Sequence, residues 1–334
     1  MRLEAGDLSW EWIGDFAEIP ESEAAARGWA HHDIALSPSG TLLTFHPGLP
    51  LVLELDTDGT LLGSWEAPLS EAHGITVASD GAQPCLWFAD NGRKRNPDDR
   101  YEYRWGPKAG HTIKTDLDGQ VLAEFGAPAL PAYADDAIYS PTKIAVHEPA
   151  IGGTGDVWTA DGYGQNLIHR YSSDGSYVLT IDGTEGAGAF KTPHAIHIDT
   201  RGAGPELYVA DRASGRVQVF DLDGDFKRSF GDEHFITPAA FAPLGEHLVV
   251  AQLNARVTIL DGADQLVGHL GDNHEVASEP GWPNMPDAAG VPSRTDRLHE
   301  GLFNSPHGVA TDEAGNIYVS EWLIGGRYTK LARR

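Results

Sequence analysis

Short runs of alternating apolar and polar residues recur along the chain, separated by turn residues. LYVAD at 207–211 and RVQVF at 216–220 are typical examples, and such alternation is characteristic of half-buried strands. Asp-Gly pairs such as Asp223-Gly224 stand between runs, where a hairpin needs a positive φ. No stretch shows convincing helical spacing, so the pattern predicts an all-β protein.

The runs group into six similar units, each with room for four strands. The units repeat with a period of roughly 40 to 50 residues, which is typical of β-propeller blades. We therefore expect a six-bladed β-propeller that forms a single domain over residues 1–334. Blades one and five are looser copies, and the clearer blades two, three, four and six begin at AHGITVASDG, SPTKIAVHEP, TPHAIHIDTRG and SPHGVATDEAG.

The two ends of the chain predict how the last blade is completed. The C-terminal segment stops after a third strand around Thr329–Leu331, while Leu8–Gly14 has a strand-like alternation of Trp and Ile. We expect the N-terminal segment to supply the missing outer strand, which would remove exposed sheet edges.

Two long segments interrupt the repeat. Residues 91–110 follow the second strand of blade two, and residues 272–301 lie between blades five and six. Long loops on a rigid scaffold are commonly functional. The first is rich in Arg, Lys and Tyr, so it is a candidate for holding an anionic or carboxylate group; a solvated loop is the equal alternative.

The net charge excludes some classes of binding partner, and the single cysteine excludes a disulfide within the chain. The formal net charge of −25 opposes binding to nucleic acid and to anionic membranes. Cys85 is the only cysteine, which excludes an intramolecular disulfide. The sequence shows neither a secretory signal nor an apolar run of about 18 residues. We expect a cytoplasmic protein with a small-molecule substrate, and the oligomeric state is not predicted.

The start of each innermost strand carries the strongest chemical signal. Innermost strands line the central channel of a propeller, so side chains at equivalent positions converge on its axis. Imidazoles at such positions can bind one metal ion. In blade order the aligned position holds His32, His73, Thr142, His194, Ala239 and His307. We predict His73, His194 and His307 as metal ligands, with His32 as a fourth candidate.

The number of imidazoles bears on the metal. Three neutral imidazoles and an open position suit catalytic zinc, whereas a fourth histidine would also suit iron or manganese. We expect a divalent metal, zinc first among these.

The repeats SPHGVATDEAGNIYVSE and TPHAIHID resemble those of peptidyl-α-hydroxyglycine α-amidating lyase, an NHL-repeat propeller family, over about residues 30 to 331. The resemblance implies zinc bound by the histidines that match His73, His194 and His307. It also implies a catalytic tyrosine at Tyr163, in Asp161-Gly162-Tyr163, and a functional arginine at Arg212. A structural calcium ion is a further implication of the family.

Four departures from the family limit which of its properties can be expected here. His46-Pro47-Gly48 stands where the family has His-Arg-Gly, so a functional arginine is missing and His46 is the candidate replacement. Gly308 stands where the family has an aspartate after its last zinc ligand, and His32 has no counterpart. The family's disulfides cannot form with one cysteine.

We expect a metal-dependent lyase or hydratase acting on a small, polar, hydroxylated substrate. The metal would act as a Lewis acid, Tyr163 as general base or acid, and Arg212 as the anchor of a carboxylate or oxyanion. One alternative is a lactonase-like metal-dependent hydrolase, against which the histidine ring argues. The other is a non-enzymatic NHL interaction module, and the acidic charge opposes its RNA-binding form.

Overall fold

The computed structural model describes residues 1–79, 81, 83–103 and 110–334. Its described strands form six antiparallel sheets of four or five strands, one for each predicted blade, besides a small two-stranded hairpin. The all-β six-bladed propeller expected from the sequence is confirmed. Its residues divide into two compact units, described separately below: unit 1 comprises Met1–Pro68, Arg93–Trp105 and Ala239–Arg334, and unit 2 comprises Leu69–Gly92 and Gly106–Pro238. The single domain expected over 1–334 stays a prediction.

Unit 2 contains blades two, three and four, each ordered from an innermost to an outermost strand. Blade two is β7 (Ala72–Ser79), β8 (Pro84–Asp90), β9 (His111–Thr115) and β10 (Val121–Phe125). Blade three is β11 (Lys143–His147), β12 (Asp156–Asp161), β13 (Leu167–Tyr171) and β14 (Tyr177–Ile181). Blade four is β15 (Pro193–Asp199), β16 (Glu206–Asp211), β17 (Arg216–Phe220) and β18 (Phe226–Phe230).

Unit 1 contains blades five, six and one. Blade five is β19 (Pro238–Leu244), β20 (His247–Gln252), β21 (Arg256–Leu260) and β22 (Leu266–Leu270). Blade six is β25 (Pro306–Thr311), β26 (Ile317–Glu321), β27 (Arg327–Arg333), β2 (Leu8–Gly14) and β1 (Arg2–Ala5). Blade one is β3 (Ile34–Leu36), β4 (Leu42–Phe45), β5 (Leu51–Leu55) and β6 (Leu61–Glu66).

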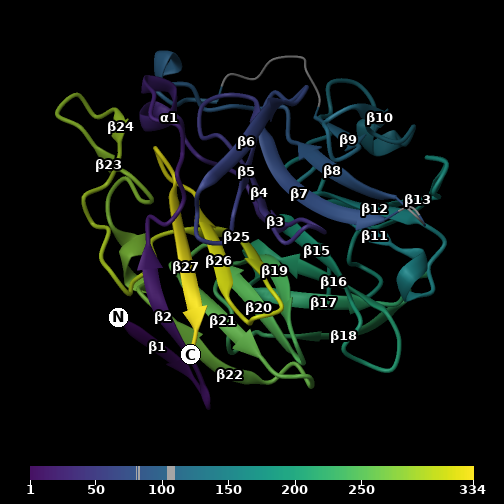
Figure 1. Ribbon diagram of the computed structural model, residues 1–334. Coiled ribbons are helices and arrows are strands. Elements are labelled where there is room, and N and C mark those ends of the chain that lie inside the picture. The colour runs from purple at the N-terminus through teal and green to yellow at the C-terminus, as the bar shows by residue number, and fades with distance from the viewer. Residues whose placement is uncertain (80, 82, 104–109) are drawn as a thin grey trace. The chain divides into compact units, whose positions relative to one another are not determined.

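The N-terminal segment completes blade six, as the sequence predicts. Strand β2 pairs antiparallel with β27, with Trp12 opposite Leu331, and the two run side by side in Figure 1. Trp10 is fully buried, and its indole Nε1 donates to the carbonyl of Gly315 at 2.9 Å. Strand β1, which the sequence analysis did not include, extends the same sheet by one further strand.

The hairpin between the third and fourth strands of blade one shows how an Asp-Gly turn is stabilised. In blade one, Oδ1 of Asp56 accepts from the amides of Asp58 and Thr60, and Gly59 takes a φ of 94°. An aspartate side chain that binds amides two and four residues on stabilises such a turn, and glycine supplies the positive φ at no steric cost. The Asp-Gly pairs therefore act as the hairpin signals expected.

Apolar side chains between neighbouring blades form the core of each unit. In unit 2, Trp158 and Ile168 of blade three pack with Ile196 and Val209 of blade four. In unit 1, blades five and six share a cluster that includes Val249, Trp10 and Leu331. Within each unit, neighbouring sheets thus pack on one another through their apolar side chains, which explains the alternation read from the sequence.

Helical structure is confined to short segments among the described residues. They are α1 (Glu23–Arg27) and the 3₁₀ turns η1 (Pro97–Asp99), η2 (Pro131–Tyr133), η3 (Pro149–Ile151), η4 (Arg212–Ser214) and η5 (His274–Ser278). The sequence did not predict α1, whose N-cap Ser22 accepts from the amide of Ala25 at 3.0 Å. The insertion between blades five and six contains the hairpin β23 (Met285–Pro286) and β24 (Pro292–Ser293). Within the described ranges, no helix has the length and apolar character to cross a membrane.

Candidate functional site

The three histidines predicted from the Pro-His and Ala-His repeats occupy the same irregular backbone position. Between β7 and β8 the strand register shifts between Ala72 and Gly74, on either side of His73. The same shift surrounds His194 in blade four and His307 in blade six. A β-bulge leaves one residue outside the ladder and redirects its side chain. At each of these positions the bulge therefore sets the direction of the imidazole, which does not follow the regular alternation of side chains along the strand.

Two of these imidazoles are held by the same kind of hydrogen bond. Nδ1 of His73 donates to the carbonyl of Thr142 at 2.6 Å in unit 2, and Nδ1 of His307 donates to the carbonyl of His32 at 3.2 Å in unit 1. In each case the carbonyl belongs to the aligned residue of the following blade. A carbonyl can only accept, so in the neutral imidazole Nδ1 carries the proton and Nε2 carries the lone pair. A hydrogen bond from one ring nitrogen to a backbone carbonyl is typical of metal-binding histidines.

Unit 2 gathers four of the predicted site residues around one oxygen. The hydroxyl of Tyr163 lies 2.9 Å from Nε2 of His194, 3.3 Å from Nε2 of His73 and 3.2 Å from a terminal nitrogen of Arg212. The rings of His73 and His194 are 4.8 Å apart, and both residues are buried. The Arg212 guanidinium carbon lies 5.3 Å from the Tyr163 ring centre. Two imidazoles, a phenol and a guanidinium thus converge from three blades.

The loop that carries Tyr163 is fixed by the carboxylate of Asp161 at the end of β12. That carboxylate accepts from the amides of Ser140 and Gln165, both at 2.6 Å. The amide of Tyr163 in turn donates to the carbonyl of Ser140 at 3.2 Å. Asp161 therefore has a structural role, as aspartate often has at tight turns, and it positions the phenol indirectly.

The approach to His194 is strained. Thr192, two residues before it, has a φ of 55°, an unusual conformation for a β-branched residue. Its amide donates at 2.8 Å to the side-chain oxygen of Asn166, which itself has a φ of 59°. Strained backbone of this kind costs about 1 to 3 kcal/mol and is found preferentially at functional sites. The contact ties the Tyr163 loop to the segment that leads into His194.

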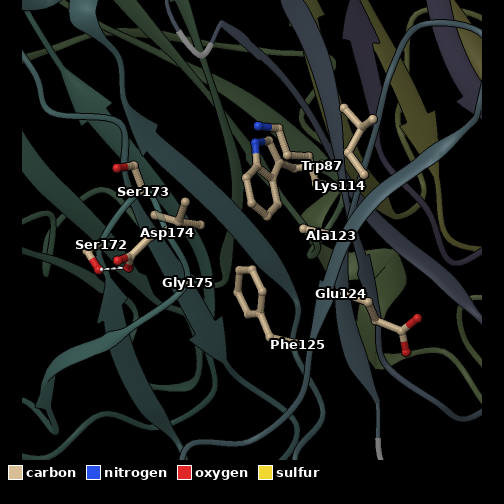
Figure 2. Close-up of a pocket in the computed structure, with 11 residues that line it drawn as sticks. Trp87, Lys114, Ala123, Glu124, Phe125, Ser172, Ser173, Asp174 and Gly175 are labelled. Atoms are coloured by element: carbon tan, nitrogen blue, oxygen red, sulfur yellow. Dashed lines mark hydrogen bonds between the residues drawn. The ribbon is translucent and has the colours of Figure 1, made fainter.

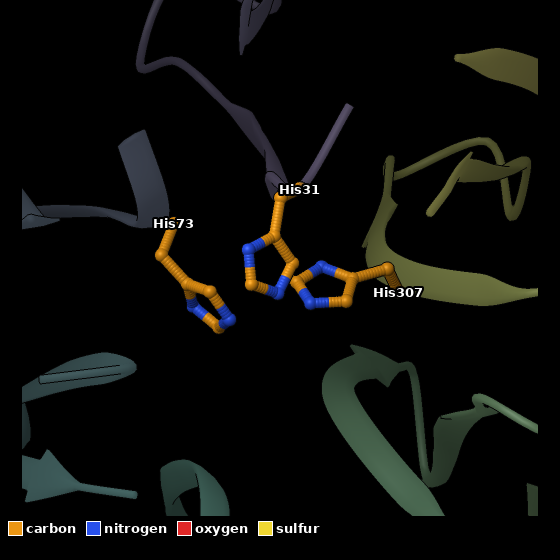
Figure 3. Close-up of side chains that lie close together, drawn as sticks. All are labelled: His31, His73 and His307. Atoms are coloured by element: carbon orange, nitrogen blue, oxygen red, sulfur yellow. The ribbon is translucent and has the colours of Figure 1, made fainter. Parts of the chain in front are cut away.

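In unit 1 the residue beside His307 is His31. The His31 and His307 rings are 4.9 Å apart, and Figure 3 shows both imidazoles as sticks. His32 instead places Nε2 2.7 Å from the hydroxyl of Tyr328 and stacks on that ring. Burial, and secondly the neighbouring His307, hold the pKa of His32 well below its usual value. The assignment of His32 as a ligand stays a prediction, and this geometry favours its neighbour His31.

Three buried histidines offer an imidazole nitrogen suited to metal binding: His31 and His307 in unit 1, and His73 in unit 2. His31 is not among the ligands predicted from the sequence; it directly precedes His32, which is. The alignment of a loose blade cannot resolve a shift of one residue, and the short strand β3 begins only at Ile34. The available signal was the His31-His32 pair itself.

Gly308 stands where the family has an aspartate, and the side chain of Asp33 fills the space beside it. A Cβ added at Gly308 would lie 2.5 Å from both Cα and Oδ1 of Asp33. The carboxylate of Asp33 therefore occupies the space that a side chain at position 308 would need. Glycine is required there because the two innermost strands approach closely.

His46, the candidate replacement for the missing arginine, organises its own loop in unit 1. Its Nδ1 accepts from the amides of Gly48 and Leu49, both at 3.0 Å. Burial, with a smaller contribution from Lys94, lowers the pKa of His46. These bonds define a structural role, and its catalytic role stays a prediction.

A separate groove of about 400 Å³ lies in unit 2 between the outer strands of blades two and three (Figure 2). Its wall includes the rings of Trp87 and Phe125, the side chain of Lys114 and the β13–β14 turn around Asp174. None of its lining residues is a site residue predicted from the sequence, so the groove is distinct from the cluster around Tyr163.

No family model matches the chain. It is 29% identical to human NHL repeat-containing protein 3 over 237 residues, which cover 67% of this chain and 61% of that protein. The mouse protein of the same name is 30% identical over 227 residues, or 64% of this chain and 58% of that protein. Rat peptidylglycine α-amidating monooxygenase is 26% identical over 211 residues, which cover 60% of this chain and only 19% of that enzyme. The chain thus spans about three fifths of the length of human NHL repeat-containing protein 3 and about a fifth of the length of the rat enzyme.

Solved structures support the fold. A streptogramin B lyase structure aligns with a TM-score of 0.58 and 14% identity over 99% of this chain and all of that chain. An inactive variant of virginiamycin B lyase from Staphylococcus aureus, solved with quinupristin, aligns with a TM-score of 0.57 and 15% identity over 96% of this chain and 99% of that chain. The chain is a six-bladed β-propeller of the NHL-repeat type, related to NHL repeat-containing protein 3 and more distantly to peptidylglycine α-amidating monooxygenase.

Proposed function

We propose that the protein is a metal-dependent lyase acting on a small hydroxylated substrate. The observation that carries the proposal is the contact of one phenol oxygen, that of Tyr163, with two imidazoles and a guanidinium. A group that accepts a proton needs neighbours that stabilise its charged form and hold it in place. The small-molecule substrate and the cytoplasmic location expected from the sequence belong to the same proposal.

The donor set fits a divalent transition metal. Neutral imidazole nitrogens are common ligands of zinc, iron and manganese, and Nδ1 of His73 is already held by a carbonyl. Within unit 2, His73 and His194 would hold the metal; the corresponding donors of unit 1 are His307 and its neighbour His31. When bound, the metal would supply Lewis acidity toward a substrate oxygen.

Tyr163 would transfer the proton. The Arg212 guanidinium, 3.2 Å from the phenol oxygen, stabilises negative charge there. In an N-acyl-α-hydroxyglycine, the ionised phenol would take the hydroxyl proton while the C–O bond becomes a carbonyl and the C–N electron pair returns to nitrogen. Tyr163 then returns the proton to that nitrogen. The products are the amide and glyoxylate, with no other reactant.

The relatives support a lyase without assigning a substrate. Peptidylglycine α-amidating monooxygenase shares the repeat, and the two lyase structures share the fold. The name of NHL repeat-containing protein 3 specifies no activity. The proposed substrate class is therefore argued from the chemistry of the Tyr163 cluster, and the experiment below tests it.

The test uses N-benzoyl-α-hydroxyglycine with the metal-loaded protein, and glyoxylate release is measured. We expect turnover by the wild type and a loss of about 10²-fold or more in Tyr163→Phe, since general acid–base groups contribute on that scale. Metal content should be unchanged in this variant. Tyr177→Phe, at an exposed tyrosine of the same unit, is the matched control. Equal turnover by Tyr163→Phe and the wild type, or none by the wild type, would contradict the proposal.

A further inference from the structure

Unit 1 contains an aromatic cluster that the proposed reaction does not use. It comprises Trp29, Tyr101, Trp282 and Trp322, with Trp322 central. The rings of Trp29 and Trp322 are 5.3 Å apart, and those of Trp282 and Trp322 are 6.1 Å apart. Tyr101 meets Trp29 at 5.7 Å. Both insertions contribute to this cluster, so the two loops that break the repeat meet on one apolar wall.

Arg95, from the first insertion, lies against this wall. Its guanidinium carbon is 4.8 Å from the Trp29 ring centre and 4.0 Å from that of Tyr103. Its Nη1 donates to the carbonyl of Tyr101 at 2.8 Å, which fixes the side chain. Among the described residues it forms no ion pair with a carboxylate, although the chain carries a net charge of −25. A guanidinium held by rings keeps its charge available for an anion.

Three buried donors of this cluster have no hydrogen-bond acceptor among the described residues. They are the indole Nε1 atoms of Trp29 and Trp322 and the Nε of Arg95. The side chain of Trp29 is nearly inaccessible, with a relative exposure of 5%. In contrast, Nε1 of Trp282 in the same cluster donates to the carbonyl of Asn304 at 2.9 Å. A buried donor without an acceptor costs about 1 to 3 kcal/mol, so three such donors within one cluster make it a candidate site for a ligand that supplies acceptor atoms.

The cluster is continuous with the histidines of unit 1. Trp322 meets the ring of His31 at 5.8 Å, and His31 meets His307 at 4.9 Å. A ligand held at the cluster would therefore lie next to imidazoles that could bind a metal. The rings would contact the apolar part of such a ligand, and the three donors would contact its acceptor atoms.

We propose that Arg95 and the indole N–H groups of Trp29 and Trp322 bind a carboxylate whose apolar body packs on the aromatic cluster. The guanidinium edge matches a planar carboxylate, to which it can donate through Nε. The inference deepens the proposed function, on which it rests only for identifying this carboxylate as part of the substrate. Binding itself requires neither a metal nor Tyr163.

The experiment measures binding of 4-fluorobenzoate by fluorine NMR line broadening, with 4-fluorobenzyl alcohol as the uncharged analogue. Metal-loaded and chelator-treated protein should both bind the benzoate and not the alcohol. Arg95→Gln should weaken benzoate binding by about tenfold or more, the value of a charge-assisted hydrogen bond. Trp322→Phe, which keeps a ring and removes one donor, should weaken it less. The control is Arg100→Gln, at an exposed arginine of the same insertion whose guanidinium donates to the carbonyl of Ala289 at 3.2 Å.

Several results would overturn the inference. They are an unchanged affinity in Arg95→Gln, equal binding of the alcohol, displacement of the benzoate by an equal concentration of inorganic phosphate, and no benzoate binding by the wild type. Benzoate binding without any turnover of N-benzoyl-α-hydroxyglycine would leave the carboxylate site standing and remove the proposed lyase. Turnover without Arg95-dependent binding would do the reverse.

Discussion

At the scale of single residues, a buried relay in blade three couples protonation to stability. The hydroxyl of Tyr133 donates to Asp161 at 2.6 Å and lies 2.7 Å from Nε2 of His169. The hydroxyl has one proton, which it gives to the carboxylate, so it accepts from Nε2–H of the imidazole. Nδ1 of His169 then accepts from the hydroxyl of Thr180 at 2.8 Å. The relay uses the neutral imidazole, and burial lowers the pKa of His169 to about 4.

The lowered pKa of His169 predicts that the folded protein loses stability as the pH falls. The unfolded chain takes up a proton at His169 near pH 6.5, whereas the folded chain does so only near pH 4. Stability from this residue is therefore complete above pH 6.5 and lost as the pH falls toward 4. Between pH 7 and pH 5 the loss should be about 2 kcal/mol. Urea unfolding at both pH values should show that His169→Gln loses less stability on acidification than the wild type by that amount.

The control for this prediction is His299→Gln, at an exposed histidine. Its pH dependence should match that of the wild type. An unchanged pH dependence in His169→Gln would mean that His169 is protonated as readily in the folded chain as in the unfolded one, and the relay would be wrong.

At the scale of elements, strands were predictable and their irregularities were not. Alternation and Asp-Gly turns identified the blades and the pairing of Leu8–Gly14 with the C-terminal strand, because these follow from local chemistry. The bulges at His73, His194 and His307 depend on how neighbouring innermost strands pack, and nothing in the sequence specified them. Helix α1 was missed because five residues are too few for a periodic pattern.

The joining of the two chain ends makes a prediction at this scale. Trp10 of β2 is fully buried, whereas Ile13 of the same strand is 40% exposed. Trp10→Ala should lower the free energy of unfolding by about 3 to 5 kcal/mol, measured by urea denaturation. Ile13→Ala should change it by about 0.5 kcal/mol or less. Equal effects of the two substitutions would contradict the burial of Trp10 in the cluster shared by blades five and six.

At the scale of the whole molecule, the repeat and the family resemblance each supplied part of the candidate site. Aligning six blades identified His73, His194 and His307, and the resemblance added Tyr163 and Arg212; the structure brings four of these five together within unit 2. His31 escaped because blade one is a loose copy. The contact of Arg95 with Trp29 could not be predicted, since it involves a loop that lies outside the repeat.

The central claim is that imidazoles on innermost strands bind a transition metal. The most direct measurement is the metal content of the purified, dialysed protein and of His73→Ala and His194→Ala, with His299→Ala as control. The account predicts about one equivalent of zinc, iron or manganese in the wild type and the control, and loss of most of it in both other variants with the β-sheet circular dichroism retained. A wild type without transition metal, or full metal content in both His73→Ala and His194→Ala, would contradict it.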